Sequence, residues 1–383
     1  MPRSCGWQRR PWSSKLGSVS IVFDLTDVET SRVTARSSEL AELMAMLHCL
    51  AEPGHHLDLG RDLKAVEASA PSALRRQLRS FAPLWARFRL RALMPLDARA
   101  DVGFSGELAG VARLPLDTFV AMAVEAIAGG RLEPRIDVLA GDADRARFLE
   151  VCRARSEERE ELGARLIQNP ELFRENLLGF LGDCHSAFFH VRWDAVIGRI
   201  RDGETEVRRR LEVDDAAVVL ASLTPGAHHF PQIAQVVYDK LQNAFVDGRG
   251  RDFVLVPSVM TRPHVIVKFD QGYPSRDVPV VVQFPVSEMD SRATSLAQLQ
   301  QRMAVLADGA RLELCRHLVN EYCSTSELAR RTGMSAPQVS RHLGRLREVG
   351  LLESVRDGKM VRHRMQLAAV YSLGYEFLAR IVR

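Results

Sequence analysis

The sequence predicts a mainly α-helical fold: a large helical amino-terminal domain with a small antiparallel β meander, then a smaller C-terminal domain of helices and a β-hairpin. Three observations predict it. Apolar residues recur at helical spacing through most of the first 250 residues. β-Branched runs separated by turn residues cluster at 251–286. Near the end, a capped amphipathic segment precedes two short strands joined by Asp357-Gly358.

Length and composition indicate two or three domains, because the chain has 383 residues and 46% of them are hydrophobic. Residues 1–18 are rich in arginine and serine and lack the apolar core of a secretory signal, so we expect a disordered basic tail. Residues 19–289 are expected to form a regulatory, effector-binding or dimerisation domain. The segment 285–293 is the expected linker, and 290–383 form the last domain.

The cellular compartment is predicted to be the cytoplasm. The six cysteines contain no Cys-x-x-Cys pair and lie mostly in apolar surroundings, which favours free thiols in a reducing compartment. No apolar run approaches the roughly 20 residues that span a bilayer, so no membrane partner is expected.

The helices of the amino-terminal domain are predicted from apolar stripes and aromatic clusters. They are expected at 38–50, 80–93, 116–128, 142–162, 171–181 and 187–211. The β meander is predicted from the runs 253–259, 264–269 and 278–284. Pro257 and Pro279 place these strands at an edge or at strand ends, because proline donates no hydrogen bond to a ladder.

The segment 335–352 has the features of a helix that enters a DNA groove. Ser335 is a good N-cap, and Pro337 falls in the first turn, where no intrahelical donor is lost. One apolar stripe must be buried, and Gly350 suits a C-cap. That stripe consists of Val339, Leu343 and Leu346. The opposite face carries short or hydrogen-bonding side chains suited to the major groove, namely Gln338, Ser340, Arg341, Gly344 and Arg345.

The flanking segments complete a helix-turn-helix with a wing. Residues 326–333 are predicted to form a short capped helix, followed by a tight turn at Gly333-Met334. Residues 351–356 and 360–366 are predicted as the two strands of a hairpin. Alternation along the second strand places Val361, His363 and Met365 on one face. It places Arg362 and Arg364 on the other, with Lys359 at the tip, which predicts a basic wing beside a phosphate backbone.

From about residue 296 onward the chain resembles the winged-helix domain of ArsR/SmtB-type bacterial transcriptional regulators. The resemblance lies in the blocks 306–314, 326–329, 335–343 and 346–352, in that order. It implies a sequence-specific regulator, a homodimeric repressor whose partner is double-stranded operator DNA. The competing hypothesis is a winged helix that binds protein. Some ArsR-like regulators also carry a long helical amino-terminal domain, similar here near Trp85 and in the Val-Pro-rich strands, which implies sensing of a small-molecule effector or dimerisation.

The charge distribution agrees with DNA binding at the C-terminal end. Residues 301–383 hold 14 Lys and Arg against 8 Asp and Glu, whereas the whole chain carries only +4. The predicted DNA-binding residues are Ser335, Pro337, Gln338, Ser340, Arg341, His342, Arg345, Arg356, Lys359, Arg362 and Arg364. Apolar stripes at 296–306 and 367–382 match the positions where the ArsR-like domains dimerise, and the alternative is packing against the chain's own amino-terminal domain.

No metal site, cofactor or enzymatic activity is predicted. The resemblance implies a Cys-x-Cys sensor before the recognition helix, but here Cys323 is followed by Thr325, and one thiolate cannot form a tetrahedral site. A redox response of Cys323 or Cys315 remains an alternative to a buried structural thiol. Cys184, His185 and His190 lack a fourth ligand. We find no phosphate-binding glycine loop, nucleophile elbow or HExxH motif.

Overall fold

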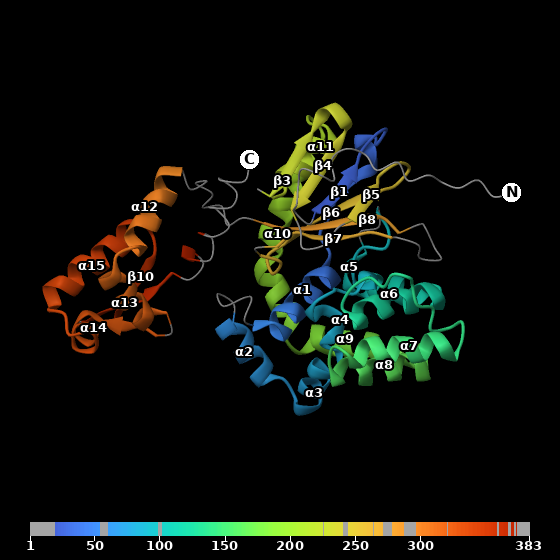
Figure 1. The fold of residues 1–383 in the computed structure, drawn as a ribbon, viewed down its shortest axis with the longest axis horizontal. Coiled ribbons are helices and arrows are strands. Elements are labelled where there is room, and N and C mark those ends of the chain that lie inside the picture. The colour runs from blue at the N-terminus through green and yellow to red at the C-terminus, as the bar shows by residue number, and fades with distance from the viewer. Residues whose placement is uncertain are drawn as a thin grey trace. The chain divides into compact units, whose positions relative to one another are not determined.

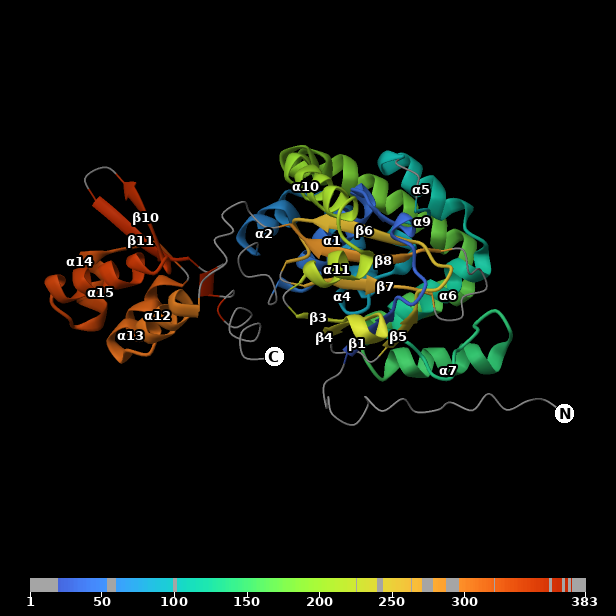
Figure 2. The ribbon, with the colours of Figure 1, turned by 90° about the horizontal axis from the view of Figure 1, so that it is seen from above.

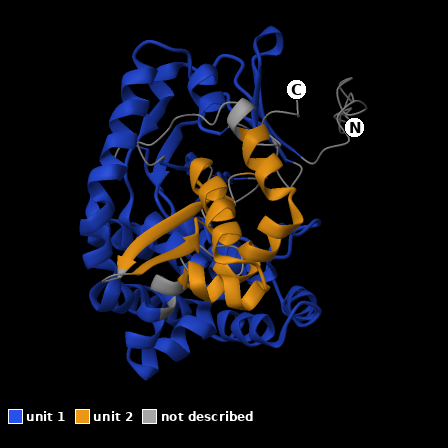
Figure 3. Cartoon of the chain, turned by 90° about the vertical axis from the view of Figure 1, so that its left-hand side faces the viewer, with its two compact units in different colours: residues 1–53, 62–286 blue, residues 54–61, 287–383 orange. Residues whose placement is uncertain are grey.

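The computed structural model describes two compact units, residues 1–53 with 62–286 and residues 54–61 with 287–383 (Figure 3). The described residues are 20–53, 60–98, 102–224, 226–239, 244–262, 264–270, 278–286, 296–319, 321–357, 360–366, 369–370 and 373. The predicted tail at 1–18 lies outside them. The mainly α-helical class is confirmed, since helices hold most of the described residues and the sheets are small.

The helices before residue 223 form the larger part of the first unit. In Figure 1, α3 to α9 gather below the strands, whereas α11 lies above them beside β3 and β4. Their bounds are α1 Glu39–Ala51, α2 Gly60–Ser69, α3 Ser72–Phe81, α4 Pro83–Ala86, α5 Gly103–Arg113, α6 Leu116–Ala128, α7 Asp142–Arg153, α8 Glu157–Gln168, α9 Pro170–Cys184, α10 His190–Leu211 and α11 Ala216–Ser222.

Two predicted helices are each divided into shorter elements in the structure. The predicted helix 80–93 is divided into the end of α3, α4 and the 3₁₀ turn η3 (Arg91–Leu93), because Pro83 starts α4 in the first turn. The predicted helix 142–162 is two helices, α7 and α8. Helix α7 ends at Arg153. Ser156 then caps the start of α8, where its hydroxyl accepts a hydrogen bond from the Arg159 amide.

The strands of the first unit form two four-stranded mixed sheets. One has the order β3-β4-β1-β5 and the other β2-β6-β8-β7. Their bounds are β1 Ser20–Asp24, β2 Val33–Ala35, β3 Ala227–Phe230, β4 Gln235–Asp239, β5 Ala244–Asp247, β6 Phe253–Ser258, β7 Ile266–Lys268 and β8 Val280–Pro285.

The predicted antiparallel meander is wrong in its pairing. β6 runs parallel to both β2 and β8, and only β7 and β8 are antiparallel. Nearly continuous burial along β6 and β8 explains the uniform apolar runs, which are typical of parallel strands covered on both faces. Pro257 lies in β6, a central strand. It is tolerated because β2 ends at Ala35, opposite Leu255, so no strand among the described residues pairs with Pro257 on that side.

Helix α10 packs closely against the second sheet. A Cβ atom at Gly203 would lie 2.3 Å from Val286 Cγ1 and 3.4 Å from Pro257 Cβ. Val207 and the α11 residues Val219 and Leu220 join the buried strand residues in one apolar core. Helix α10 is joined to α9 by a π-helical turn, His185–Phe189.

The second unit is a small domain built on its own core. It contains α12 Leu296–Leu306, α13 Gly309–Leu318, α14 Thr325–Thr332 and α15 Ala336–Glu348, with a sheet of order β10-β11-β9. The strands are β9 Cys323–Ser324, β10 Leu352–Asp357 and β11 Met360–Met365. In Figure 2 the β10–β11 hairpin, which we call the wing, projects beyond the helices of this unit. Strand β9 was not predicted, because two residues give no alternating pattern.

The predicted dimerisation stripes are covered only in part by the described residues. Leu299 is buried in the unit's own core and Leu306 packs against it, whereas Met303 on α12 is 43% exposed. Most of the predicted helix 367–382 lies outside the described residues. In the part of the chain that the structure describes, no helix has the length and apolarity required to cross a membrane.

Candidate nucleic-acid interface

Two capped helices and a left-handed glycine set the angle of the candidate interface. Ser324 and Glu327 form a capping box at α14, with the Ser324 amide donating to Glu327 Oε2 at 2.8 Å. Gly333 then takes a φ of 72°, a conformation that favours glycine, and ends α14. The predicted helix-turn-helix is therefore present, with Ser324 as the cap of its first helix.

The apolar stripe of α15 is buried as predicted. Val339, Leu343 and Leu346 lie in the core of the unit. Gly350 has a φ of 72° and follows the last helical turn, where the Leu351 amide donates to the Leu346 carbonyl at 2.9 Å. The opposite face is thereby presented to solvent, and Ser335, Pro337, Ser340, Arg341 and Arg345 are exposed on it.

Gln338 serves the start of α15. Its Oε1 accepts hydrogen bonds from the backbone amide and the hydroxyl of Ser335, both at 2.9 Å. The Ser335 hydroxyl therefore donates to a side chain in this contact. Only the amide group of Gln338 remains to donate to a base or a phosphate.

The cations of α15 differ in how they are engaged. Arg345 Nη1 lies 3.2 Å from Glu348 Oε2 in an exposed ion pair, and His342 is half-buried. Arg341 is exposed, and within the described residues it has no hydrogen bond or ion pair. Arg341 is thus the α15 cation that can meet a ligand without first breaking an intramolecular contact.

The predicted basic wing has two environments. Arg356 is exposed near the hairpin end, and Lys359 lies outside the described residues. Arg362 and Arg364 are half-buried. Arg364 Nε lies 3.3 Å from Glu353 Oε1, and its guanidinium lies over the Tyr322 ring, 5.3 Å from the centroid. Tyr322 in turn donates to Glu353 at 2.7 Å, so Arg364 is held inside the domain.

The buried side of the wing holds His363, which is 4% exposed. Its Nδ1 lies 2.9 Å from Ser354 Oγ, to which Arg347 Nη2 also donates at 3.4 Å. Burial lowers the pKa of His363, and the positive charge of Arg347 lowers it further. Val361 was predicted to share this face but is 45% exposed, because it lies nearer the hairpin end than the core extends.

Cys323 lies between the helices and the wing. It is fully buried, and its Sγ donates to the His317 carbonyl at 3.6 Å and lies 3.5 Å from Arg331 Nη1. Burial raises the pKa of the Cys323 thiol. The other described cysteines are also buried free thiols. No group of three or more His, Cys, Asp or Glu side chains suited to a metal ion occurs among the described residues.

Sequence reasoning missed Arg330 as a candidate. It lies at the end of α14, is exposed, and has no hydrogen bond or ion pair among the described residues. The adjacent arginines Arg330 and Arg331 were the available signal, but the sequence does not show which of the two is free to bind a ligand. Arg331 is paired with Glu321, whereas Arg330 is not.

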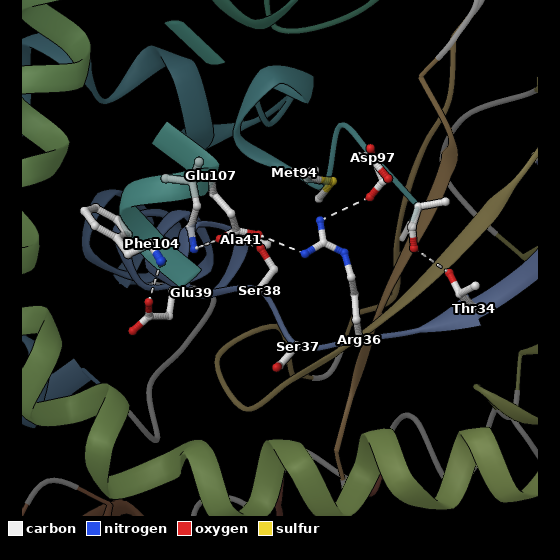
Figure 4. Close-up of polar contacts among 12 residues, drawn as sticks. Thr34, Arg36, Ser37, Ser38, Glu39, Ala41, Met94, Asp97, Phe104 and Glu107 are labelled. Atoms are coloured by element: carbon white, nitrogen blue, oxygen red, sulfur yellow. Dashed lines mark hydrogen bonds and ion pairs between the residues drawn. The ribbon is translucent and has the colours of Figure 1, made fainter. Parts of the chain in front are cut away.

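Buried charges and cavities occur among the described residues of the first unit. In Figure 4, Arg36 follows β2 and pairs with Glu107 at 3.5 Å, with both side chains only 7% exposed. Helices α1 and α5 cap each other: Glu107 accepts from the Leu40 amide and Glu39 from the Phe104 amide. Burial raises the pKa of Glu107.

The first cavity has a volume of about 370 Å³. Its wall combines apolar residues such as Leu47 and Trp85 with charged residues such as Arg79 and Glu158. The second, of about 420 Å³, lies between the edge strand β2 and the end of α10 at Arg208.

Comparison with known proteins gives two family matches. Residues 19–290 match the family of unknown function DUF5937, and residues 306–355 match a helix-turn-helix domain. The chain is 37% identical over 62 residues to the HTH-type transcriptional regulator KmtR of Mycobacterium tuberculosis, which is 16% of this chain and 48% of that protein. The chain therefore spans about half the length of this curated relative.

Two further proteins are similar to about a fifth of the chain. The Biofilm growth-associated repressor of Agrobacterium fabrum is 34% identical over 83 residues, which is 22% of this chain and 68% of the repressor. A solved ArsR-like transcriptional regulator from Rhodococcus sp. RHA1 is 34% identical, with a TM-score of 0.21. The match covers 22% of this chain and 80% of the Rhodococcus chain.

Proposed function

Because this chain belongs to the DUF5937 family and carries a helix-turn-helix domain at its C-terminal end, we propose that it is a sequence-specific DNA-binding transcriptional regulator. Within this proposal the chain acts as a homodimeric repressor of the ArsR type. The second unit binds double-stranded operator DNA, and the first unit controls that binding in response to an effector.

The observation that carries the proposal is the division of α15 into two faces. Its apolar face is locked into the domain core, so the helix cannot turn its polar face inward. The exposed face carries Ser340 and Arg341, and Arg341 has no intramolecular partner within the described residues. An exposed guanidinium without such a partner, on a helix that follows a tight turn, suits bidentate contact with guanine in the major groove.

Control through the first unit is supported by its size and by its buried charges and cavities. An effector regulates DNA binding only if it has different affinities for two arrangements of the recognition helices. In a homodimer these helices lie about 34 Å apart on an inverted repeat, so a small change in spacing or angle weakens binding. Met303 on α12 supplies exposed apolar surface for the dimer contact.

The test begins with selection of bound genomic fragments by the full chain. On the selected operator, Arg341→Ala should weaken binding by about 1–3 kcal/mol, with a smaller loss on random DNA. Arg316→Ala is the matched control, because it removes the same charge from an exposed ion pair on α13. Equal losses on both DNAs would identify Arg341 as a phosphate contact and not a base-reading residue.

Salt dependence separates this function from protein binding. Release of counterions from DNA lowers log Kobs by about 0.9 per neutralised phosphate for each tenfold rise in salt. A regulator with several phosphate contacts must therefore lose affinity steeply between 50 and 200 mM salt. A flat dependence, or failure to select any fragment, would contradict the proposal.

A further inference from the structure

The second cavity of the first unit, between β2 and the end of α10, has the size of a small-molecule site. Its volume of about 420 Å³ falls within the range of ligand pockets in proteins, which is roughly 300–1,000 Å³. Its apolar side chains are aliphatic in the described part of the wall, and they are Val33, Ala35, Ala98 and Leu211. Such a wall suits the short apolar body of a small molecule.

Arg36 brings a buried cation to this cavity, and one of its donors is unsatisfied. In the view of Figure 4 its guanidinium lies between Glu107 and Thr34. Nη2 donates to the Asp97 carbonyl at 3.2 Å, and Nη1 lies 3.5 Å from Glu107 Oε1. Nε has no hydrogen-bond partner within the part of the chain that the structure describes. A buried donor without an acceptor is costly, so the Arg36 guanidinium gains from a further acceptor in the cavity.

Arg208 adds a second cation, from α10. Its Nε donates to the Ala35 carbonyl at 2.9 Å, and its Nη2 lies 2.6 Å from Glu204 Oε1. These contacts hold the side chain against β2, whereas Nη1 donates no hydrogen bond to any described residue. Since the side chain is 57% exposed, Nη1 is available to a molecule in the cavity.

The charges of the cavity wall favour an anion. The charged side chains among the described lining residues are Arg36, Arg208 and Glu212, two cations against one carboxylate. Glu212 is exposed, so water screens its charge more than that of buried Arg36. Glu107 and Glu204 offset part of the positive charge, but each leaves one donor of its arginine without an acceptor.

We propose that this cavity binds a small aliphatic carboxylate. The anionic group accepts hydrogen bonds from Arg36 and Arg208, and the apolar body contacts Val33 and Leu211. Guanidinium groups suit this ligand, because their donors match the two oxygens of a carboxylate. The assignment rests on the proposed function in one respect, since it gives the chemical class of the effector that the first unit senses.

Helix α10 connects this cavity with the end of the first unit. Gly203 lies on the same helix as Arg208, and a Cβ atom at Gly203 would clash with Val286. Val286 is the last residue of the first unit before residues 287–383. Because no space is left at Gly203, a shift of α10 caused by a ligand at Arg208 must be passed to Val286.

Calorimetric titration of the full chain without DNA tests the site. Hexanoate is the probe, and hexanamide at the same ionic strength is its uncharged counterpart of similar shape. We expect a single hexanoate site per chain with about tenfold higher affinity than for hexanamide, because an ionised acceptor makes the stronger hydrogen bonds. Equal affinity for the two probes, or no binding of hexanoate, would overturn the proposal.

Three variants of α10 assign the binding to this cavity. Arg208→Met should weaken hexanoate binding by about fivefold, and Glu212→Gln should strengthen it by about twofold. Arg209→Met is the matched control and should leave the affinity unchanged, because Arg209 pairs with exposed Glu206 and is not among the described lining residues. Equal losses in the Arg208 and Arg209 variants would contradict the proposal.

The role of Arg36 needs a double variant, because removing it alone leaves Glu107 buried without its partner. Arg36→Met with Glu107→Gln makes the pair uncharged and keeps an acceptor for the Leu40 amide. Hexanoate binding should fall by about fivefold or more. Wild-type affinity in the folded double variant would exclude Arg36 from the site, and if that variant does not fold, the more exposed Arg208 decides.

Operator binding distinguishes a failure of the site from a failure of the proposed function. Saturating hexanoate should change the operator affinity of the wild-type chain and leave that of Arg208→Met unchanged. If hexanoate binds with the expected variant pattern and operator affinity does not change, the binding site stands and its role as the effector site is overturned.

Discussion

The arginines of the wing illustrate that equal charge in the sequence does not mean equal access in the fold. Alternation along β11 assigned Arg362 and Arg364 to one outward face. The structure holds Arg364 between Glu353 and the Tyr322 ring, whereas Arg356 on β10 is exposed. The sequence could not distinguish them, because Tyr322 lies more than 30 residues before the strand that it covers.

Substitution of Arg356 and substitution of Arg364 should therefore have different effects on DNA binding and stability. Arg356→Ala should leave stability unchanged, weaken binding to all DNA sequences alike and lower the salt slope by about 1. Arg364→Ala should destabilise the second unit by about 1 kcal/mol, because it removes a partly buried ion pair and a cation–π contact. Urea unfolding and salt-dependent DNA titrations of both variants measure this contrast. A larger change in salt slope for Arg364→Ala than for Arg356→Ala would contradict it.

His363 should make the stability of the second unit depend on pH. Its pKa in the folded chain is lowered from 6.5 by burial. The unfolded chain therefore binds more protons between the two pKa values. Stability is fully present above about pH 6.5 and is lost as the pH falls through the folded pKa.

The measurement is urea unfolding of the second unit between pH 5 and 7.5, with His363→Gln as the comparison. The variant should lose part of the pH dependence in this range and keep the part that comes from carboxylates. An identical pH dependence in both proteins would show that His363 does not contribute.

At the scale of elements, sequence patterns predicted the helices better than the sheets. Local information suffices for α6 and α15, where a stripe of apolar residues and a clear stop signal lie within one segment. The strand β2 has only three residues, and its partner β6 lies about 220 residues later. No local pattern records such a pairing, so the parallel arrangement could not be predicted.

Most of the candidate site could be predicted, because its features are local. The apolar stripe of α15, its exposed face and the glycine turn all follow from spacing within about 20 residues. The capping role of Gln338 could not be predicted from residue type alone, since a glutamine three residues after a serine suits both helix capping and contact with a base.

Two glycines of α10 provide a matched test of how the helix packs. Gly203→Ala places a methyl group 2.3 Å from Val286 Cγ1 and should destabilise the first unit by about 1–3 kcal/mol. Gly198→Ala meets nothing within 4 Å and should stabilise the helix by about 0.5–1 kcal/mol. Chemical denaturation measures the change in the free energy of unfolding for each variant, and we expect opposite signs. Equal changes in the two variants would argue against the close packing at Gly203.

At the scale of the whole molecule, the two units have separate cores. The core of the second unit is built from residues 299–373, so a fragment of residues 287–383 should fold alone. Within the proposed function, this fragment should bind the selected operator without responding to the effector that releases the full chain. Fluorescence anisotropy with labelled operator measures both. A fragment that folds and still responds would place the effector site in the second unit.

The pairing of β2 with β6 also affects how the protein is made. Val33 and Phe253 are register partners. A ribosome adds about 5–20 residues per second, so β2 emerges roughly 10–45 s before its neighbour exists. During that interval the edges of β1 and β2 are unpaired on the nascent chain, a state that favours association with other chains. Folding of the first unit, and with it the yield in the cell, should therefore depend on the supply of chaperones. The contacts of the second unit are short-range in sequence, so it should fold soon after it leaves the exit tunnel.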